Sequence, residues 1–279
     1  MYQQHFGLVE APFGITPDTS FAFAARAHQE ALNTLLLAIR DGEGFVKITG
    51  EVGTGKTLLC RRFLATLGAD CKTAYLPNPA LRPQTLLLAL ARELGLDITP
   101  ETDEYSLMRA LNELLLAEAA AGRRVVVCLD EVQAMPLPTL ETVRLLSNLE
   151  TEKRKLLQVV LFGQPELDAR LAEPSVRQIR QRIAFHYHLS GLTRLELQAY
   201  LDHRLRVAGY RGPALFEGGA TRSLYRASRG IPRLVNILAH KALISAYGRG
   251  ARTVSAAHVR RAARDTEGAR RAWLTGWMG

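Results

Sequence analysis

Cysteine is scarce in this chain: only Cys60, Cys71 and Cys128 occur among its 279 residues. Their odd number argues against a disulfide framework, and their spacing matches no cysteine-based metal site. No apolar run approaches the ~20 residues that a membrane-spanning helix needs. The opening residues MYQQHFGLVEAPFG lack the basic start and apolar stretch of a secretory signal. We therefore expect a protein of the reducing cytoplasm, and we interpret Cys128 as a small core residue.

Metal-binding histidine pairs are also missing, because no H-E-x-x-H segment occurs. His186 and His188 share one face of a predicted strand, and we interpret them as core or interface residues rather than metal ligands. The chain contains no internal repeat and no low-complexity segment. Zinc chemistry and repeat architectures are therefore not expected.

The charge is unbalanced, with 36 Lys and Arg residues against 27 Asp and Glu residues and a net charge of +9. A basic surface suits nucleic acid, an anionic membrane face or an acidic partner, and the composition does not choose among them. Because the basic residues are spread along the chain, a merely solvated basic surface stays an equal alternative. Apolar residues make up 47% of the chain, which is enough for a sizeable core.

The chain divides into an alternating part and a helical part. Short apolar runs typical of buried strands occur at Phe45–Thr49, Thr73–Leu76, Val125–Leu129, Leu157–Phe162 and Ala184–Leu189. Helical patterns lie before and between them at His28–Arg40, Lys56–Leu67, Gln84–Leu94, Ser106–Ala121, Pro138–Leu149 and Pro174–Gln181. This alternation predicts an α/β fold with a parallel sheet covered by helices on both faces.

After Leu192 only helical patterns follow, near Arg194–Ala208, Glu217–Ala227, Ile231–Tyr247 and Ser255–Thr266. We therefore predict a parallel-sheet domain over residues 1–190, in which residues 1–24 form an irregular lead-in. A small all-α lid domain is predicted over residues 191–266, and a short tail over residues 267–279.

The segment Gly50–Thr57 has the sequence GEVGTGKT and matches the P-loop pattern G-x-x-x-x-G-K-[ST]. Its glycines let backbone N–H groups turn toward phosphate oxygens, and the following helix points its positive dipole end at them. Lys56 is expected to reach the β- and γ-phosphates of ATP, and the Thr57 hydroxyl to hold Mg²⁺. The predicted nucleotide-binding residues are Gly50, Glu51, Val52, Gly53, Thr54, Gly55, Lys56, Thr57 and Leu58.

A second buried strand pattern, Val125–Leu129, ends in the carboxylates Asp130 and Glu131. Beside a P-loop, Asp130 is expected to support the Mg²⁺ ion, and Glu131 to act as the general base for the attacking water. A third strand pattern ends in the amide Gln164, which could hydrogen-bond the γ-phosphate or that water. The alternative for Gln164 is an ordinary turn residue.

Two arginines are candidates for stabilising the charge that develops on a transferred phosphoryl group. Arg182 stands immediately before the last predicted strand, and Arg233 stands at the start of a lid helix. Arginine is abundant in this chain, so a plain surface position is the alternative for each.

With these motifs in hand, the chain resembles AAA+ ATPases of the family that assists type II secretion and type IV pilus assembly. The resemblance spans residues 1 to about 267. Within that family the chain is most similar to the MSHA pilus branch, with the secretion-pathway protein A group a little further off. It is carried by FGL at 6–8, GEGF before the P-loop, DEVQAM at 130–135, LETE at 149–152, FGQPEL at 162–167, RQRI at 180–183 and GIPRLVN at 230–236.

The resemblance implies roles for four further residues. Gln164 takes the sensor-1 position, Arg233 takes the sensor-2 position, and Arg182 takes the place of an arginine finger that acts on a neighbouring subunit, with Arg180 as its substitute. Asn78 takes the position of a polar residue that restrains Glu131 until a partner binds. Secretion-type relatives continue into a transmembrane helix and a peptidoglycan-binding module, and because this chain stops at Gly279 we do not expect it to contact peptidoglycan.

The expected function is ATP-driven assembly of an MSHA-type IV pilus or a related secretion apparatus. The expected protein is a homo-oligomer that is cytoplasmic, peripheral to the inner membrane and in contact with inner-membrane assembly proteins. Two alternatives stay open. One is a DNA-binding AAA+ regulator, which the basic pI favours but no recognition-helix motif supports. The other is a nucleotide-dependent scaffold with negligible turnover.

Both tryptophans of the chain, Trp273 and Trp277, stand within its last seven residues. A helix would place them on one face, and Arg270 and Arg271 directly precede them. This composition is typical of weak contact with an anionic membrane surface. The alternatives are that the two rings cover an apolar patch on the protein's own lid or on a partner subunit, or that the tail is disordered.

Overall fold

The computed structural model describes residues 2–15, 19–21, 23–150 and 155–270. Its chain forms two compact units. One unit comprises His28–Glu51 and Lys56–Leu189, and the other comprises Met1–Ala27, Val52–Gly55 and Ser190–Gly279.

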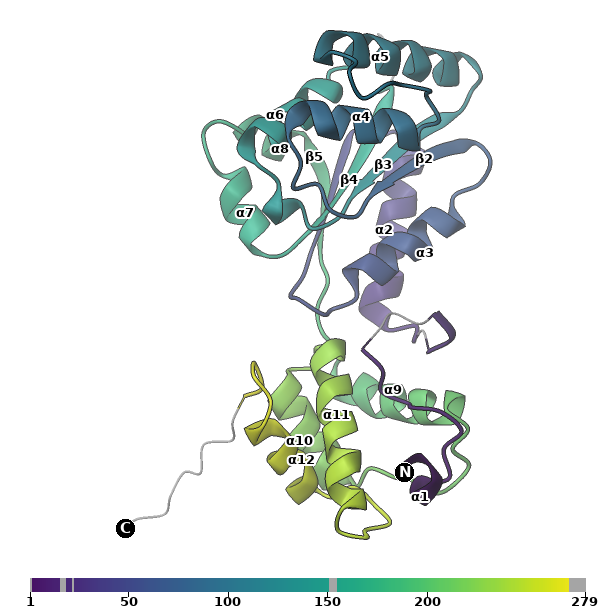
Figure 1. Cartoon of the computed structure of the whole chain (residues 1–279), viewed down its shortest axis with the longest axis vertical. Coiled ribbons are helices and arrows are strands. Elements are labelled where there is room, and N and C mark those ends of the chain that lie inside the picture. Colours follow the sequence, from purple (N-terminus) through teal and green to yellow (C-terminus); the bar gives the residue numbers. More distant parts are fainter. Residues whose placement is uncertain (1, 16–18, 22, 151–154, 271–279) are drawn as a thin grey trace. The chain divides into compact units, whose positions relative to one another are not determined.

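The first unit is built on a five-stranded parallel sheet (Figure 1). The strands are β1 (Phe45–Thr49), β2 (Cys71–Leu76), β3 (Arg124–Leu129), β4 (Leu157–Gly163) and β5 (Ile183–His188). They lie in the order β2-β3-β4-β1-β5, so the strands that end in the P-loop and in Asp130 flank β4. The predicted α/β parallel-sheet fold is therefore confirmed.

Helices cover both faces of the sheet. They are α2 (Arg26–Asp41), α3 (Lys56–Thr66), α4 (Pro83–Glu93), α5 (Glu104–Ala120), α6 (Leu137–Leu146), α7 (Glu166–Leu171) and α8 (Arg177–Arg182). The short helix α7 was not predicted, because six residues that follow a proline make too little periodic pattern. A 3₁₀ turn at Val132–Ala134 follows the Asp130-Glu131 pair.

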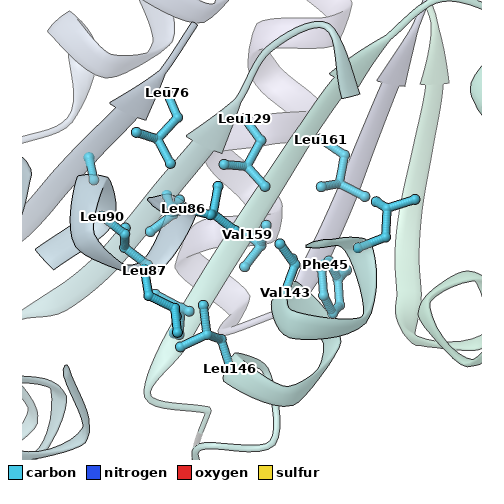
Figure 2. Close-up of a cluster of buried hydrophobic side chains, with 14 of the residues drawn as sticks. Phe45, Leu76, Leu86, Leu87, Leu90, Leu129, Val143, Leu146, Val159 and Leu161 are labelled. Carbon is cyan, nitrogen blue, oxygen red and sulfur yellow. The ribbon is translucent and has the colours of Figure 1, made fainter. Parts of the chain in front are cut away.

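The two sides of the sheet are separated by the alternation of side chains along each strand. Phe45, Leu129 and Leu161 point into one buried cluster with Leu87 of α4 and Val143 of α6 (Figure 2). On the opposite side, Gln158 of β4 donates hydrogen bonds to the carbonyl oxygens of Ile39 (3.1 Å) and Glu43 (3.1 Å), at the end of α2 and just after it. Strands buried from both sides are almost wholly apolar, which is why the sequence pattern located them.

The second unit is helical. Its main helices are α9 (Arg194–Val207), α10 (Gly218–Ser228), α11 (Pro232–Tyr247) and α12 (Ala256–Arg264), all close to the predicted bounds. Helix α9 begins with a capping box, in which Thr193 Oγ1 accepts from the Glu196 N–H at 3.2 Å and the Glu196 carboxylate accepts from the Thr193 N–H at 2.8 Å. This reciprocal pair satisfies two of the unpaired N–H groups at a helix start.

The N-terminal segment differs from its prediction. We expected an irregular lead-in to the sheet domain, whereas Met1–Ala27 groups with the C-terminal helices and includes the short helix α1 (Tyr2–Phe6) and the 3₁₀ turn Thr19–Phe21. The reason is a buried arginine: Arg204 of α9 donates to the Pro12 carbonyl at 2.5 Å and lies 4.7 Å from the Phe21 ring centroid. Phe6 and Phe13 join the same apolar core.

No helix in the described part of the chain is long and apolar enough to cross a membrane. The predicted membrane contact of Trp273 and Trp277 falls on residues that the structure does not describe.

The buried thiol of Cys128 has a pKa that is raised chiefly by desolvation. A raised thiol pKa disfavours the reactive thiolate, in agreement with the interpretation of Cys128 as a core residue.

Candidate nucleotide site

The P-loop lies between the end of β1 and the start of α3. The N–H of Gly50 donates to the Gly163 carbonyl at 3.2 Å, which ties the beginning of the loop to the end of β4. Gly53 and Gly55 have φ angles of 86° and 98°, which is a left-handed backbone conformation that residues with a Cβ rarely adopt. Helix α3 then begins at Lys56. The glycines therefore satisfy the backbone requirement that the sequence pattern implied.

Lys56 is a buried cation, with only 5% of its surface exposed. Its Nζ donates to the carbonyl oxygens of Gly50 (2.7 Å) and Glu51 (3.2 Å). Desolvation lowers the Lys56 pKa, and the carboxylates of Glu131, Asp130 and Glu51 act in the opposite direction. A buried ammonium whose direct partners are neutral carbonyls is costly, and the oxygens of a phosphate would satisfy it. The site therefore fits an anionic phosphate group.

Thr57 and Asp130 form the second element of the site. The Thr57 hydroxyl donates to Asp130 Oδ2 at 2.6 Å, and the Tyr75 hydroxyl donates to the same oxygen at 3.4 Å. Desolvation raises the Asp130 pKa, while the hydrogen bonds from Thr57 and from the Glu131 N–H lower it. A hydroxyl and a carboxylate are the oxygen donors that Mg²⁺ takes beside substrate phosphates, so Thr57 and Asp130 fit that ion.

Glu131 follows Asp130 in a left-handed conformation, with φ 55° and ψ 37°. Such a backbone is uncommon for a residue with a side chain, and it costs roughly 1–3 kcal/mol. It directs the carboxylate to two amides: Gln133 Nε2 and Gln164 Nε2 both donate to Glu131 Oε2, the latter at 3.1 Å. The strained residue therefore lies at the carboxyl edge of the sheet, in contact with the loop after β4.

Gln133 joins the ends of β3 and β4. Its Oε1 accepts from the Gln164 N–H at 3.0 Å, while its own carbonyl accepts a hydrogen bond from the Arg170 side chain on α7. Sequence reasoning missed both Gln133 and Tyr75. Gln133 stands two residues after Glu131, a position from which its side chain can reach back to that carboxylate. Tyr75 is the penultimate residue of β2, which pairs with β3.

Asn78 does not take the expected position. Its side chain is exposed, and its Oδ1 accepts from the Ala80 N–H at 3.3 Å. Among the described residues, the amides that hold Glu131 are those of Gln133 and Gln164. The assignment of Asn78 as the residue that restrains Glu131 is therefore corrected. The Asn78 side chain instead forms an Asx turn, in which it accepts a hydrogen bond from a backbone N–H of its own loop.

The two candidate arginines are both exposed. Arg182 ends α8, and its guanidinium donates to Ser147 Oγ at 2.8 Å. Arg233 is the second residue of α11, and its N–H donates to the Gly53 carbonyl at 3.2 Å within the second unit. A Cβ on Gly53 would lie 2.5 Å from the Arg233 Cβ, so this approach requires a glycine.

The remaining predicted P-loop residues differ in exposure. Glu51 and Val52 are exposed, Thr54 is buried, and Leu58 is half-buried on α3. The described residues contain no group of three or more His, Cys, Asp or Glu side chains that could hold a metal ion.

Known proteins resemble this chain in sequence and in fold. The family model described as "AAA domain" matches residues 39–171. The general secretion pathway protein A of Aeromonas hydrophila is 43% identical over 280 residues, which cover 100% of this chain and 51% of that protein. The chain thus spans about half the length of this curated relative.

Three solved structures share the fold at low identity. The ORC2 protein of Aeropyrum pernix, solved as ADPNP-ADP complexes, has a TM-score of 0.61 at 20% identity, covering 90% of this chain and 72% of that one. Cdc6p of Pyrobaculum aerophilum has a TM-score of 0.65 at 17% identity, covering 90% and 71%. The RuvB branch migration motor of Thermotoga maritima has a TM-score of 0.56 at 17% identity, covering 85% and 68%. By fold, the chain is a P-loop NTPase of the AAA type, and by sequence it is related to a general secretion pathway protein A.

Proposed function

We propose that this protein is an AAA+ ATPase that hydrolyses ATP to ADP and phosphate. The observation that carries the proposal is the convergence of three groups at the carboxyl ends of β1 and β3. The first group is the buried ammonium of Lys56, and the second is the hydroxyl–carboxylate pair of Thr57 and Asp130. The third is the carboxylate of Glu131, whose backbone is in the left-handed conformation. Ligands of parallel α/β sheets bind at this edge.

Each group has a separate task in the proposed reaction. Lys56 binds the β- and γ-phosphate oxygens of ATP in place of its backbone carbonyl partners. Thr57 and Asp130 hold Mg²⁺, which when bound neutralises charge on those oxygens. Glu131 accepts the proton of the attacking water, and Gln164 orients that water or the γ-phosphate. Arg233 is proposed as the sensor-2 arginine, and Arg182 as the finger supplied to a neighbouring subunit.

The proposed use of this ATPase is assembly of a secretion apparatus or of an MSHA-type pilus. The support is the name and 43% identity of the Aeromonas relative, together with the motifs that resemble the secretion and pilus family. In this proposal the protein is a homo-oligomer, works in the cytoplasm at the inner membrane, and contacts inner-membrane assembly proteins.

The test is a pair of variants in the purified chain. Glu131→Gln should bind ATP with wild-type affinity and lose hydrolysis by roughly 10²–10⁴-fold, because an amide does not accept the proton. Lys56→Ala should weaken ATP binding by roughly 100-fold, through loss of charge-assisted hydrogen bonds. The control is Glu101→Gln, which changes an exposed carboxylate outside the site. Wild-type phosphate release by Glu131→Gln would overturn the assignment of the base.

One observation favours a second candidate, the nucleotide-dependent scaffold. The Glu131 carboxylate is tied by two amides, an arrangement that would hold it away from a water molecule until it is released. An oligomer that forms with ATP and releases no phosphate would favour this candidate. The DNA-binding alternative rests on the net charge of +9, and salt-dependent binding to duplex DNA would favour it.

A further inference from the structure

The second unit contains a cavity that is not part of the nucleotide site. It lies between α10 and α12 and has a volume of about 1020 Å³. Its floor is apolar, since Ala227, Val259 and Ala263 are buried there and Tyr225 is half-buried beside them. Pockets of roughly 300–1,000 Å³ accept a drug-sized ligand or a few side chains. An occupant that fills this floor must bring apolar surface.

The rim of the same cavity is cationic. Its five arginines are all exposed: Arg226, Arg229, Arg260, Arg264 and Arg270. Within the described part of the chain, none of the five forms an ion pair with a carboxylate. The carboxylate of Asp265, next to Arg264 in the sequence, is bound by Lys241 at 2.9 Å.

The placement of these arginines costs stability. Arg260 and Arg264 are four residues apart on α12, so their like charges repel across one helical turn. Arg229 closes α10 in a left-handed conformation with φ 54°, a position that usually favours glycine. An anionic occupant that brings carboxylates to the rim would offset the repulsion between Arg260 and Arg264.

We propose that this cavity binds an acidic peptide segment with an aromatic or apolar anchor residue, supplied by a partner protein. The planar guanidinium fork matches a carboxylate in bidentate geometry, and the buried floor takes the anchor side chain. Duplex DNA fits this cavity less well than a peptide does. Its phosphates lie on a convex surface, and proteins read it with elements that protrude into its grooves. The cavity lies wholly in the helical unit, so the proposal stands independently of ATP hydrolysis.

The experiment measures binding of a labelled random copolymer of glutamate and tyrosine to the full chain by fluorescence anisotropy. Polyglutamate of the same length is the comparison. The copolymer should bind more tightly than polyglutamate, because only the copolymer fills the floor. The double variant Arg226→Glu/Arg264→Glu should weaken copolymer binding by about tenfold or more. The matched control, Arg211→Glu/Arg252→Glu, reverses two exposed charges outside the cavity and should leave binding unchanged.

A third variant separates the floor from the rim. Ser223→Trp fills the cavity from its half-buried wall without changing charge, so it should abolish the preference for copolymer over polyglutamate. Thermal unfolding verifies that each variant is folded before binding is compared. Equal binding of the two polymers to the wild type would overturn the proposal. So would a loss of affinity in Arg226→Glu/Arg264→Glu that is confined to duplex DNA or to vesicles containing phosphatidylglycerol.

Discussion

The side chain of Gln133 donates a hydrogen bond to Glu131 Oε2, the same oxygen that accepts from Gln164 Nε2 at 3.1 Å. Gln133 also accepts from the Gln164 N–H at 3.0 Å, so one side chain holds both the proposed base and the loop after β4. A charged acceptor with two amide donors is well satisfied where it is. The position of Glu131 is therefore set by two strand ends rather than by its own loop alone.

The first prediction follows from this arrangement. Gln133→Ala should lower kcat for ATP hydrolysis by roughly tenfold and leave the ATP dissociation constant unchanged, because Glu131 loses a positioning donor but no phosphate ligand. Steady-state kinetics and equilibrium nucleotide binding measure the two quantities separately. The control is Gln84→Ala, which removes an exposed amide that bonds the Thr102 carbonyl at 2.9 Å. A parallel loss of binding and kcat in Gln133→Ala would contradict a positioning role.

A second prediction concerns Asp130 and pH. Desolvation raises the Asp130 pKa in the folded protein above its usual value of 3.8. The folded chain therefore binds a proton more strongly than the unfolded chain, and stability from this group is lost as pH rises through the folded pKa. Asp130→Asn should then be more stable than the wild type at pH 7, with a difference that shrinks toward pH 4. Urea unfolding at both pH values, without Mg²⁺, measures the effect. A less stable Asp130→Asn at pH 7 would contradict it.

The N-terminal segment provides the third prediction. Arg204→Ala should destabilise the helical unit by about 2–4 kcal/mol, because it leaves the buried Pro12 carbonyl unsatisfied and removes a cation–π contact with Phe21. Arg206→Ala is the matched control, since Arg206 is exposed and bonds only a carbonyl of its own helix, at 3.3 Å. Denaturant unfolding of both variants should show a large loss for the first and less than about 0.5 kcal/mol for the second.

The strands and most helices could be predicted from the sequence because their signals are local. Phe45–Thr49 is apolar except for Lys47 and the terminal Thr49, and the structure gives β1 the same bounds. In contrast, β2 begins at Cys71 rather than Thr73, since Cys71 and Lys72 are half-buried at the sheet edge and interrupt the apolar pattern. Edge strands carry a weaker signal than central ones.

Contacts between distant residues could not be predicted in this way. The bond between Arg204 and the Pro12 carbonyl joins positions 192 residues apart, so residues 1–24 looked irregular when read alone. Gln133 contacts Gln164 across 31 residues, and only the pairing of β3 with β4 brings them together. Asn78 was assigned by resemblance to other proteins, whereas its local Asx turn satisfies the side chain first.

The last prediction concerns a shared active site. Arg182 is exposed at the end of α8 and is held by Ser147 Oγ at 2.8 Å, so its guanidinium is presented on the surface of its own subunit. An arginine supplied in trans is worth roughly 10³–10⁵-fold in rate in well-studied GTPases. Arg182→Ala should therefore bind ATP normally and hydrolyse it slowly.

A mixing experiment tests this role. Lys56→Ala should be inactive because it does not bind ATP, yet it still carries an intact Arg182. Mixing the slow Arg182→Ala chain with the inactive Lys56→Ala chain should restore hydrolysis, since a Lys56→Ala subunit can supply Arg182 to a neighbour that holds ATP. Arg177→Ala, which removes an exposed arginine at the other end of α8, is the control and should remain active alone. Phosphate release is measured across a range of mixing ratios and total concentrations. A mixture no more active than its parts, or full activity from a chain that stays monomeric with ATP, would show that Arg182 does not act on a neighbouring subunit.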